Sequence, residues 1–167
     1  MSTTKIVSEI KTIPNHVNSI YAFLSDFRKI AKVFELAAEN PQVQEQIEAK
    51  TKKKMNFKDQ IEHWEATEDN CSFVIKSFGE AGLQFVKKEE NKSLKLTGYG
   101  RSPFEFYLWI QLIEKGPYET KVRLTVHAEL NAMMKMMLKK KLEKGINQLA
   151  EGMTQIPYHN LQNIESI

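Results

Sequence analysis

The chain opens with residues that alternate in polarity one by one over positions 4–13. This period of two residues is typical of a β-strand. Ile6, Ser8, Ile10 and Thr12 fall on one predicted face, and Lys5, Val7, Glu9 and Lys11 fall on the other. Pro14 ends the strand, and we expect Asn15 to cap the helix that follows it.

From His16 onward the apolar residues recur every three or four positions, which predicts two helices. The first contains Val17, Ile20, Tyr21 and Leu24, and the second contains Phe27, Ile30, Val33 and Phe34. Ser25-Asp26 lies between them and can end one helix and cap the next. The charge-rich residues 39–54 either extend the second helix or form a flap, and the sequence leaves both possibilities open.

Residues 57–130 show one strand pattern after another. The expected strands are 57–67, 71–78, 82–90, 93–100, 103–114 and 119–130. The joins carry turn-forming residues such as Gly79-Glu80, Glu90-Asn91-Lys92 and Gly100-Arg101-Ser102. Since a parallel crossover needs a dozen or more residues, joins this short predict antiparallel neighbours.

The last two predicted strands each have one apolar and one polar face. In 119–130 the apolar positions are Val122, Leu124, Val126, Ala128 and Leu130. In 103–114 they are Phe104, Phe106, Leu108, Ile110 and Leu112, whereas Tyr107 and Trp109 point the other way. This pattern indicates a sheet that is covered on one side only.

A long amphipathic helix is predicted at residues 131–155, with Asn131 as its cap. Its apolar face contains Leu130, Met134, Leu138, Leu142, Gly145, Ile146, Leu149 and Met153. Four of its first residues, at positions 133, 134, 136 and 137, are methionine, and Met136 falls on the outer face. Beyond Pro157 we expect a frayed end.

The predicted order is therefore β-α-α-β6-α, an α+β chain read as one domain over residues 1–167. This order resembles the START-like, or SRPBCC, superfamily, which includes polyketide cyclase/dehydrase-like proteins and has a helix-grip fold. The resemblance rests on the opening strand with Pro14, the helix VNSIYAFLSD at 17–26, and the segment 120–134.

The resemblance implies a curved, antiparallel seven-stranded sheet wrapped around the C-terminal helix, with a deep cavity between them. Members of the superfamily bind lipids, sterols, plant hormones or polyketides, and others act as cyclases, ring-hydroxylase subunits or co-chaperones. The superfamily has no shared catalytic residue that can be carried over, so the resemblance implies the fold and not the activity.

The residues expected to bind a ligand come from two strands and the long helix. They are Phe104, Phe106, Leu108, Val126, Met134, Leu138, Lys141, Leu142, Gly145, Ile146 and Leu149. Gly145 either lets the sheet approach closely or leaves room for a guest, because glycine inside a helix costs about 1 kcal/mol relative to alanine. Lys141 either extends past the rim to water or meets an anionic head group at the cavity mouth.

No catalytic, metal or cofactor signature stands out. His16, His63, His127 and His159 are scattered, and none has a partner at metal-ligand spacing. Cys71 is the single cysteine, so we expect an inert buried thiol. A nucleophile elbow, a phosphate loop and a dinucleotide fingerprint are all absent from the sequence.

The composition of the chain narrows the kinds of partner that we expect. Hydrophobic residues make up 41% and charged residues 27% of the chain, and the net charge is +3. The basic stretches 50–54 and 139–141 have acids nearby, so we expect solvated faces and no nucleic acid. The sequence has neither a signal-peptide pattern nor an apolar stretch long enough to span a bilayer, which predicts a cytoplasmic protein without stable membrane insertion. We expect it to be a monomer or a homodimer.

Three functions remain in competition. The first is a carrier or sensor that binds a small hydrophobic, lipid-like or polyketide-like molecule. The second is a polyketide cyclase- or dehydratase-like enzyme, which requires titratable groups such as Lys141 or His63 inside the cavity. The third is a co-chaperone- or antitoxin-like interaction module that uses residues 50–58 and Met136 as contact surface.

Overall fold

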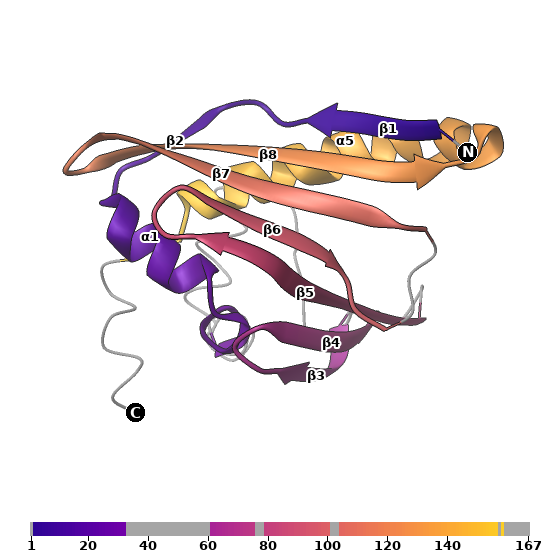
Figure 1. Ribbon diagram of the computed structural model, residues 1–167, viewed down its shortest axis with the longest axis horizontal. Coiled ribbons are helices and arrows are strands. Elements are labelled where there is room, and N and C mark those ends of the chain that lie inside the picture. Colours follow the sequence, from indigo (N-terminus) through magenta and orange to yellow (C-terminus); the bar gives the residue numbers. More distant parts are fainter. Residues whose placement is uncertain (1, 33–60, 76–78, 101–103, 157, 159–167) are drawn as a thin grey trace.

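The computed structural model describes residues 2–32, 61–75, 79–100, 104–156 and 158. In Figure 1 the strands form one curved sheet, α5 runs behind it, and α1 lies at one end. The first part of the chain comprises β1 (Ser2–Val7), β2 (Lys11–Ile13), α1 (Val17–Leu24) and helical residues 27–32. The strands that follow are β3 (Ile61–Ala66), β4 (Asn70–Ile75), β5 (Gly79–Glu89), β6 (Ser93–Gly98), β7 (Phe106–Gly116) and β8 (Glu119–Leu130), and α5 (Ala132–Thr154) comes last.

The described strands form one antiparallel sheet in the order β1-β8-β7-β6-β5-β4-β3, with β2 also paired to β8. The α+β class, the antiparallel pairing and the long terminal helix are thus confirmed. Gly79 and Glu80 are a correction: they begin β5 and do not form a turn. The predictions for residues 33–60 lie outside the described residues.

The opening strand is split in two, which gives the sheet an extra strand. The Ser8 backbone N–H donates to the Leu124 carbonyl, and the Ser8 hydroxyl accepts from the Leu124 N–H, both at 2.8–2.9 Å. After Ser8 the alternation shifts by one residue, so Ile13 is buried, whereas Ile10, predicted to share a face with the buried Ile6, is exposed. Such a shift is the effect of a bulge on side-chain direction.

In β7 and β8 the predicted apolar residues point to one face of the sheet and the predicted polar residues to the other. Leu108 pairs with Val126 on one side and with Leu96 on the other, and Ile6 also pairs with Val126. These residues share the concave face because residues that lie opposite each other in a sheet point the same way. Trp109 lies on the convex face, where its ring meets that of His127 at 4.6 Å.

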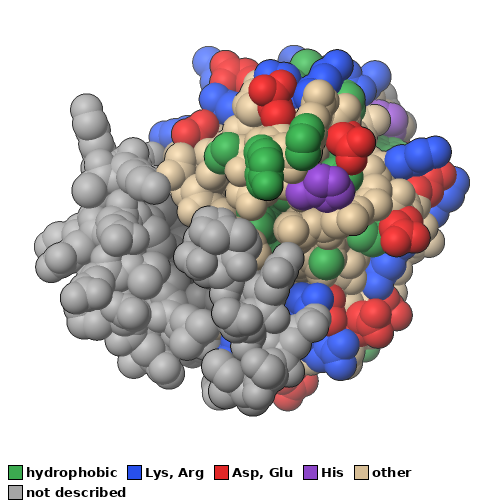
Figure 2. All heavy atoms as spheres, turned by 90° about the vertical axis from the view of Figure 1, so that its left-hand side faces the viewer, with side chains coloured by type: hydrophobic (Ala, Val, Ile, Leu, Met, Phe, Trp, Pro, Cys, Tyr) green, Lys and Arg blue, Asp and Glu red, His purple; other side chains and the backbone are tan. Residues whose placement is uncertain are grey.

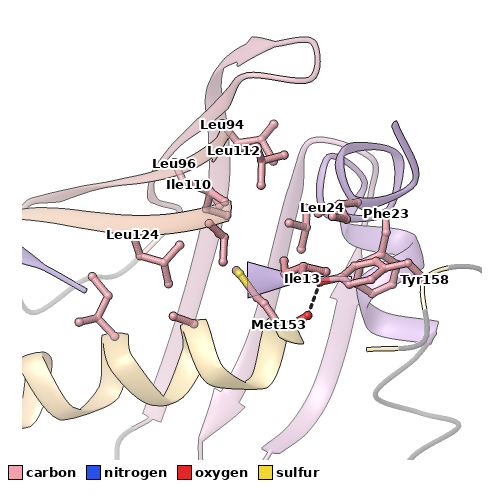
Figure 3. Close-up of a cluster of buried hydrophobic side chains, with 14 of the residues drawn as sticks. Ile13, Phe23, Leu24, Leu94, Leu96, Ile110, Leu112, Leu124, Met153 and Tyr158 are labelled. Atoms are coloured by element: carbon pink, nitrogen blue, oxygen red, sulfur yellow. Dashed lines mark hydrogen bonds between the residues drawn. The ribbon is translucent and has the colours of Figure 1, made fainter. Parts of the chain in front are cut away.

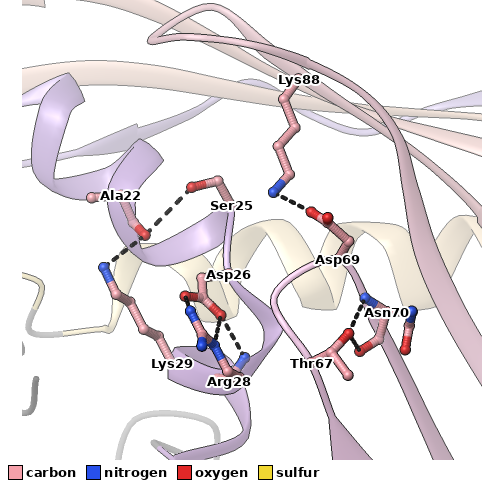
Figure 4. Close-up of polar contacts among 9 residues, drawn as sticks. All are labelled: Ala22, Ser25, Asp26, Arg28, Lys29, Thr67, Asp69, Asn70 and Lys88. Carbon is pink, nitrogen blue, oxygen red and sulfur yellow. Dashed lines mark hydrogen bonds and ion pairs between the residues drawn. The ribbon is translucent and has the colours of Figure 1, made fainter.

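Of the cap residues predicted for the first helices, one is wrong and one is confirmed. His16, and not Asn15, caps α1, because its Nδ1 accepts a hydrogen bond from the Asn18 N–H at 3.1 Å. Asn15 instead belongs to the turn: its N–H donates to the Ile13 carbonyl at 2.8 Å. Asp26 caps the second helix as expected, since its Oδ1 accepts from the Arg28 N–H at 2.9 Å (Figure 4).

The core gathers at the α1 end of the molecule. Side chains from β2, α1, β6, β7 and β8 meet the C-terminal half of α5 there (Figure 3). The fully buried members include Ile13, Ile20, Leu94, Val122, Leu124 and Ala150. Tyr158 completes this core: it is 1% exposed, its ring lies edge-on to Phe23 at 5.6 Å, and its hydroxyl donates to the Met153 carbonyl at 2.6 Å. The expected fraying beyond Pro157 is therefore wrong for Tyr158.

Strands approach each other closely around Cys71 on β4, next to the edge strand β3. A Cβ added to Gly82 would lie 2.5 Å from the Tyr99 carbonyl oxygen and 2.8 Å from that of Cys71, so only glycine fits this position. Cys71 is buried, and burial raises the pKa of its thiol although a backbone hydrogen bond from Leu83 opposes the change. The buried thiol predicted from the sequence is thus confirmed, and its raised pKa makes it a poor nucleophile.

Candidate ligand-binding site

The concave face of the sheet is wider than the helix that lies on it. Helix α5 packs mainly on β8, β2 and β1, which form one side of the sheet. Strands β5 and β4 are placed further across, beyond β7 and β6. A single helix about 10 Å wide therefore covers only part of the concave face.

The two halves of α5 meet the sheet differently. In the C-terminal half, Ile146, Ala150 and Met153 are buried in the core. In the N-terminal half, Met134, Leu138 and Leu142 are only half-buried. The tight packing of the core therefore does not continue along the whole helix.

Several apolar residues on the concave face of the sheet are also half-buried. They include Phe106, Leu108 and Val126 on β7 and β8, and Phe73, Leu83 and Phe85 on β4 and β5. Protein cores are packed at the density of organic crystals, so an inward-pointing apolar side chain that keeps accessible area is less closely enclosed than the side chains of the core. We call these six residues together with Met134, Leu138 and Leu142 the inner apolar surface.

Thr4 adds a polar atom to this region. It points inward beside Ala128, which in turn pairs with Phe106, and it is 5% exposed. Its hydroxyl has no hydrogen-bond partner among the described residues. Burying a hydroxyl without a partner costs about 1–3 kcal/mol, so this hydroxyl destabilises the fold by about that amount. Sequence reasoning missed Thr4, although the alternation puts it on the same face as Ile6.

Aromatic rings gather where β5 approaches the helical residues 27–32. The ring of Phe85 stacks on that of Phe27 with centroids 4.4 Å apart. The Lys88 ammonium lies 4.8 Å from the Phe85 centroid and pairs with Asp69 at 2.6 Å (Figure 4). At this end of the inner apolar surface, Phe85 is therefore fixed by neighbours on two sides.

Asp26 forms an ion pair with Arg28 in the same region. Its carboxylate accepts two hydrogen bonds from the Arg28 side chain, at 3.1 and 2.8 Å, and is largely buried (Figure 4). Burial opposes ionisation, but the Arg28 hydrogen bonds and charge outweigh it, so the pKa of Asp26 lies below its ordinary value. Asp26 is therefore a structural carboxylate that stays charged at neutral pH.

The eleven residues expected to bind a ligand divide into two groups. Six of them, Phe106, Leu108, Val126, Met134, Leu138 and Leu142, belong to the inner apolar surface, and Phe104 is half-buried with its ring 5.8 Å from that of Phe106. Ile146 is buried in the core, whereas Lys141, Gly145 and Leu149 are exposed. A Cβ added to Gly145 would meet no atom within 4 Å, so the sheet does not approach it closely.

Other sequence expectations lie elsewhere on the molecule. The described residues hold no group of three or more His, Cys, Asp and Glu side chains that could bind a metal ion. No helix in the described part of the chain is long and apolar enough to cross a bilayer. Met136 is 86% exposed, and Met133 and Met137 are exposed beside it.

Comparison with known proteins identifies the fold. Neither the protein-family models nor the curated proteins contain a match to this chain. Norcoclaurine synthase from Thalictrum flavum, a Bet v1-like protein, superposes with a TM-score of 0.65 at 10% identity, over 92% of this chain and 86% of its own. The chain has a START/SRPBCC-like helix-grip fold.

Further structures share this fold at equally low identity. A solution structure of a protein from Thermobifida fusca superposes with a TM-score of 0.58 at 11% identity, over 96% of this chain and 95% of its own. Norcoclaurine synthase has also been solved in complex with dopamine and hydroxybenzaldehyde, in a structure that superposes with a TM-score of 0.61 at 8% identity over 92% of this chain and 86% of its own.

Proposed function

We propose that this protein binds a small hydrophobic molecule between the concave face of its sheet and the N-terminal half of α5, as a carrier or sensor. The observation that carries the proposal is the inner apolar surface, in which residues of both the sheet and the helix point inward yet remain half-buried. Apolar concave surfaces with few polar groups are the usual binding sites for small molecules.

The surface also suggests the chemistry of the guest. Its residues are aliphatic, aromatic or thioether side chains, which favour a lipid-like or polyketide-like molecule. Met134 is flexible and polarisable, so it can adapt to guests of different shape. Norcoclaurine synthase, solved with dopamine and hydroxybenzaldehyde, is an example of small aromatic guests bound to a protein of this fold.

The enzyme alternative has less support among the described residues. It requires at least two titratable side chains in the cavity. Lys141, the candidate with a described side chain, is exposed, and burial leaves the Cys71 thiol protonated at neutral pH. Binding without chemistry is therefore the function that the geometry supports best.

Native mass spectrometry of protein purified from its own cells tests the proposal. We expect a one-to-one complex whose extra mass is lost on extraction with organic solvent. As a second arm, solvent-extracted protein should take up one equivalent of an uncharged apolar fluorophore such as N-phenyl-1-naphthylamine. A bare chain in the first arm together with no saturable uptake in the second would refute the proposal.

A further inference from the structure

A separate hollow lies on the convex face of the sheet, on the side away from α5. Its volume is about 270 Å³, and three adjacent strands line it. The lining residues are Lys5 and Val7 of β1, Arg123, Thr125 and His127 of β8, and Trp109 and Gln111 of β7. Each alternates along its strand with residues of the concave face, so the thickness of the sheet separates this hollow, which we call the outer hollow, from the inner apolar surface.

The pairing of the strands brings the polar groups of the outer hollow together. Lys5 lies opposite His127, Trp109 lies opposite Thr125, and Gln111 lies opposite Arg123. The Arg123 Nε donates to the Gln111 Oε1 at 2.8 Å. This bond orients the guanidinium group and leaves its two terminal nitrogens available for a ligand.

Aromatic side chains lie beside these cations. The Trp109 ring is half-buried, meets His127 edge-on at 4.6 Å and lies 6.0 Å from the ring of Tyr107. The Lys95 ammonium is 5.2 Å from the Trp109 centroid and 4.5 Å from that of Tyr107. The aromatic group is therefore held by its neighbours and has a third cation, Lys95, over its rings.

The charged side chains that line the outer hollow are positive. Its lining includes the cations Lys5 and Arg123 and no carboxylate, and neither cation is paired with an acid among the described residues. The acid next along β8, Glu129, accepts a hydrogen bond from the Thr3 hydroxyl. By contrast, acidic and basic side chains are interspersed over the described part of the face in Figure 2. Unpaired cations in a concave site attract anions and can hold them through charge-assisted hydrogen bonds.

We propose that the outer hollow binds a small aromatic anion, namely an aromatic carboxylate or an aromatic phosphate monoester. The anionic group lies between Lys5 and Arg123, and the ring packs against Trp109 and His127. A volume of about 270 Å³ fits one ring with one anionic group, since drug-sized ligands occupy about 300 Å³ or more. This site is independent of the hydrophobic guest proposed for the concave face.

The two tryptophan indole N–H signals in a proton–nitrogen NMR spectrum test this site. Trp64 and Trp109 are the two tryptophans of the chain, and the variant Trp64→Phe assigns their signals. Titration with benzoate or phenyl phosphate should move the Trp109 signal saturably and leave the Trp64 signal in place. Comparing the two probes shows whether the site prefers a carboxylate or a phosphate. Adding N-phenyl-1-naphthylamine should not displace either anion, which separates this test from that of the concave site.

Charge variants show whether the binding is specific. Arg123→Gln should weaken the binding of the preferred anion by about tenfold or more, as expected for loss of a hydrogen bond between charged groups. Lys140→Gln is the matched control because it removes the same charge from an exposed position on α5 and should leave the affinity unchanged. Three results would each overturn the proposal: no saturable shift, equal affinity for inorganic phosphate and phenyl phosphate, or equal affinity in Arg123→Gln. Binding of an oligothymidine strand but of neither small anion would instead identify a nucleic-acid surface.

Discussion

Leu108 and Val126 lie directly opposite each other in the β7–β8 ladder, and both are half-buried although they point to the concave side of the sheet. Two residues further along the same strands, the pair Ile110 and Leu124 has the same apolar character and the same facing but is buried. The boundary between the filled core and the inner apolar surface therefore runs between these two pairs.

Filling the space beside Leu108 should remove the binding site without removing the core. In Leu108→Trp the larger side chain occupies the volume proposed for the guest, so we expect the affinity for N-phenyl-1-naphthylamine to fall at least about tenfold, a loss of about 1.4 kcal/mol. The thermal midpoint should change little, because overpacking is costly only where the core is already full.

The matched control for this variant is Ile113→Trp, a similar enlargement on the same strand but at an exposed position. It should bind the fluorophore as the unmodified protein does. Equal affinities in the two variants would show that the fluorophore binds elsewhere. Circular dichroism melts of both variants confirm that each is folded.

Replacing Thr4 by valine should stabilise the empty protein. The side chains have nearly the same shape, and the change removes a buried hydroxyl that has no partner among the described residues, so we expect a gain of about 1 kcal/mol in the free energy of unfolding. The contrasting variant is Ser8→Ala, which removes a buried hydroxyl that accepts a hydrogen bond at 2.9 Å and should destabilise the fold. Urea unfolding measures both changes, and a loss of stability in Thr4→Val would show that its hydroxyl is satisfied.

Asp26 should make stability depend on pH in the acid range. Its pKa is lower in the folded protein than in the unfolded chain, so its contribution is fully present above the unfolded pKa of about 3.9 and is lost as the pH falls through the folded pKa. Asp26→Asn should therefore reduce stability at pH 7 and have little effect at the lowest pH at which the protein stays folded. Urea unfolding between pH 7 and pH 2.5 measures this, and an equal loss at every pH would contradict the role of the charge.

Tyr158 should stabilise the end of α5. Tyr158→Phe keeps the ring against Phe23 but removes the hydrogen bond to the Met153 carbonyl, so a loss of about 1 kcal/mol is expected. Tyr158→Ala also removes the buried ring and should cost about 3–5 kcal/mol, as for other large aromatic residues in cores. Thermal unfolding compares the two variants, and an unchanged midpoint in Tyr158→Ala would contradict its place in the core.

The sequence predicts the layout of this fold well because most elements depend on local periodicity. The alternation through Val122, Leu124 and Val126 is strict enough to fix which face of β8 is buried. Asn131 is confirmed as the cap of α5, since its Oδ1 accepts from the Met134 N–H at 2.8 Å. Where one shift in register decides the facing, as at Ile10, periodicity alone gives the wrong side.

The details of the two sites are harder to predict because they depend on contacts between distant segments. Leu149 belongs to the predicted buried face of α5 and Ala150 does not, but Ala150 is buried and Leu149 is 46% exposed. The difference reflects how the helix is rotated on the sheet, which the spacing does not determine. The outer hollow brings Lys5 next to His127 only through the β1–β8 pairing, so no motif in the sequence indicates it.

Methyl NMR on the methionines of α5 is the most direct test of a guest bound under this helix. Met134 is half-buried on the inner apolar surface, Met153 is buried in the core, and Met136 is exposed, so one helix carries the probe and both controls. On titration with N-phenyl-1-naphthylamine we expect the Met134 methyl signal to shift saturably at one equivalent, while the Met136 and Met153 signals stay in place. A shift of Met136 without Met134, or no saturable shift at all, would contradict a binding site between the sheet and α5.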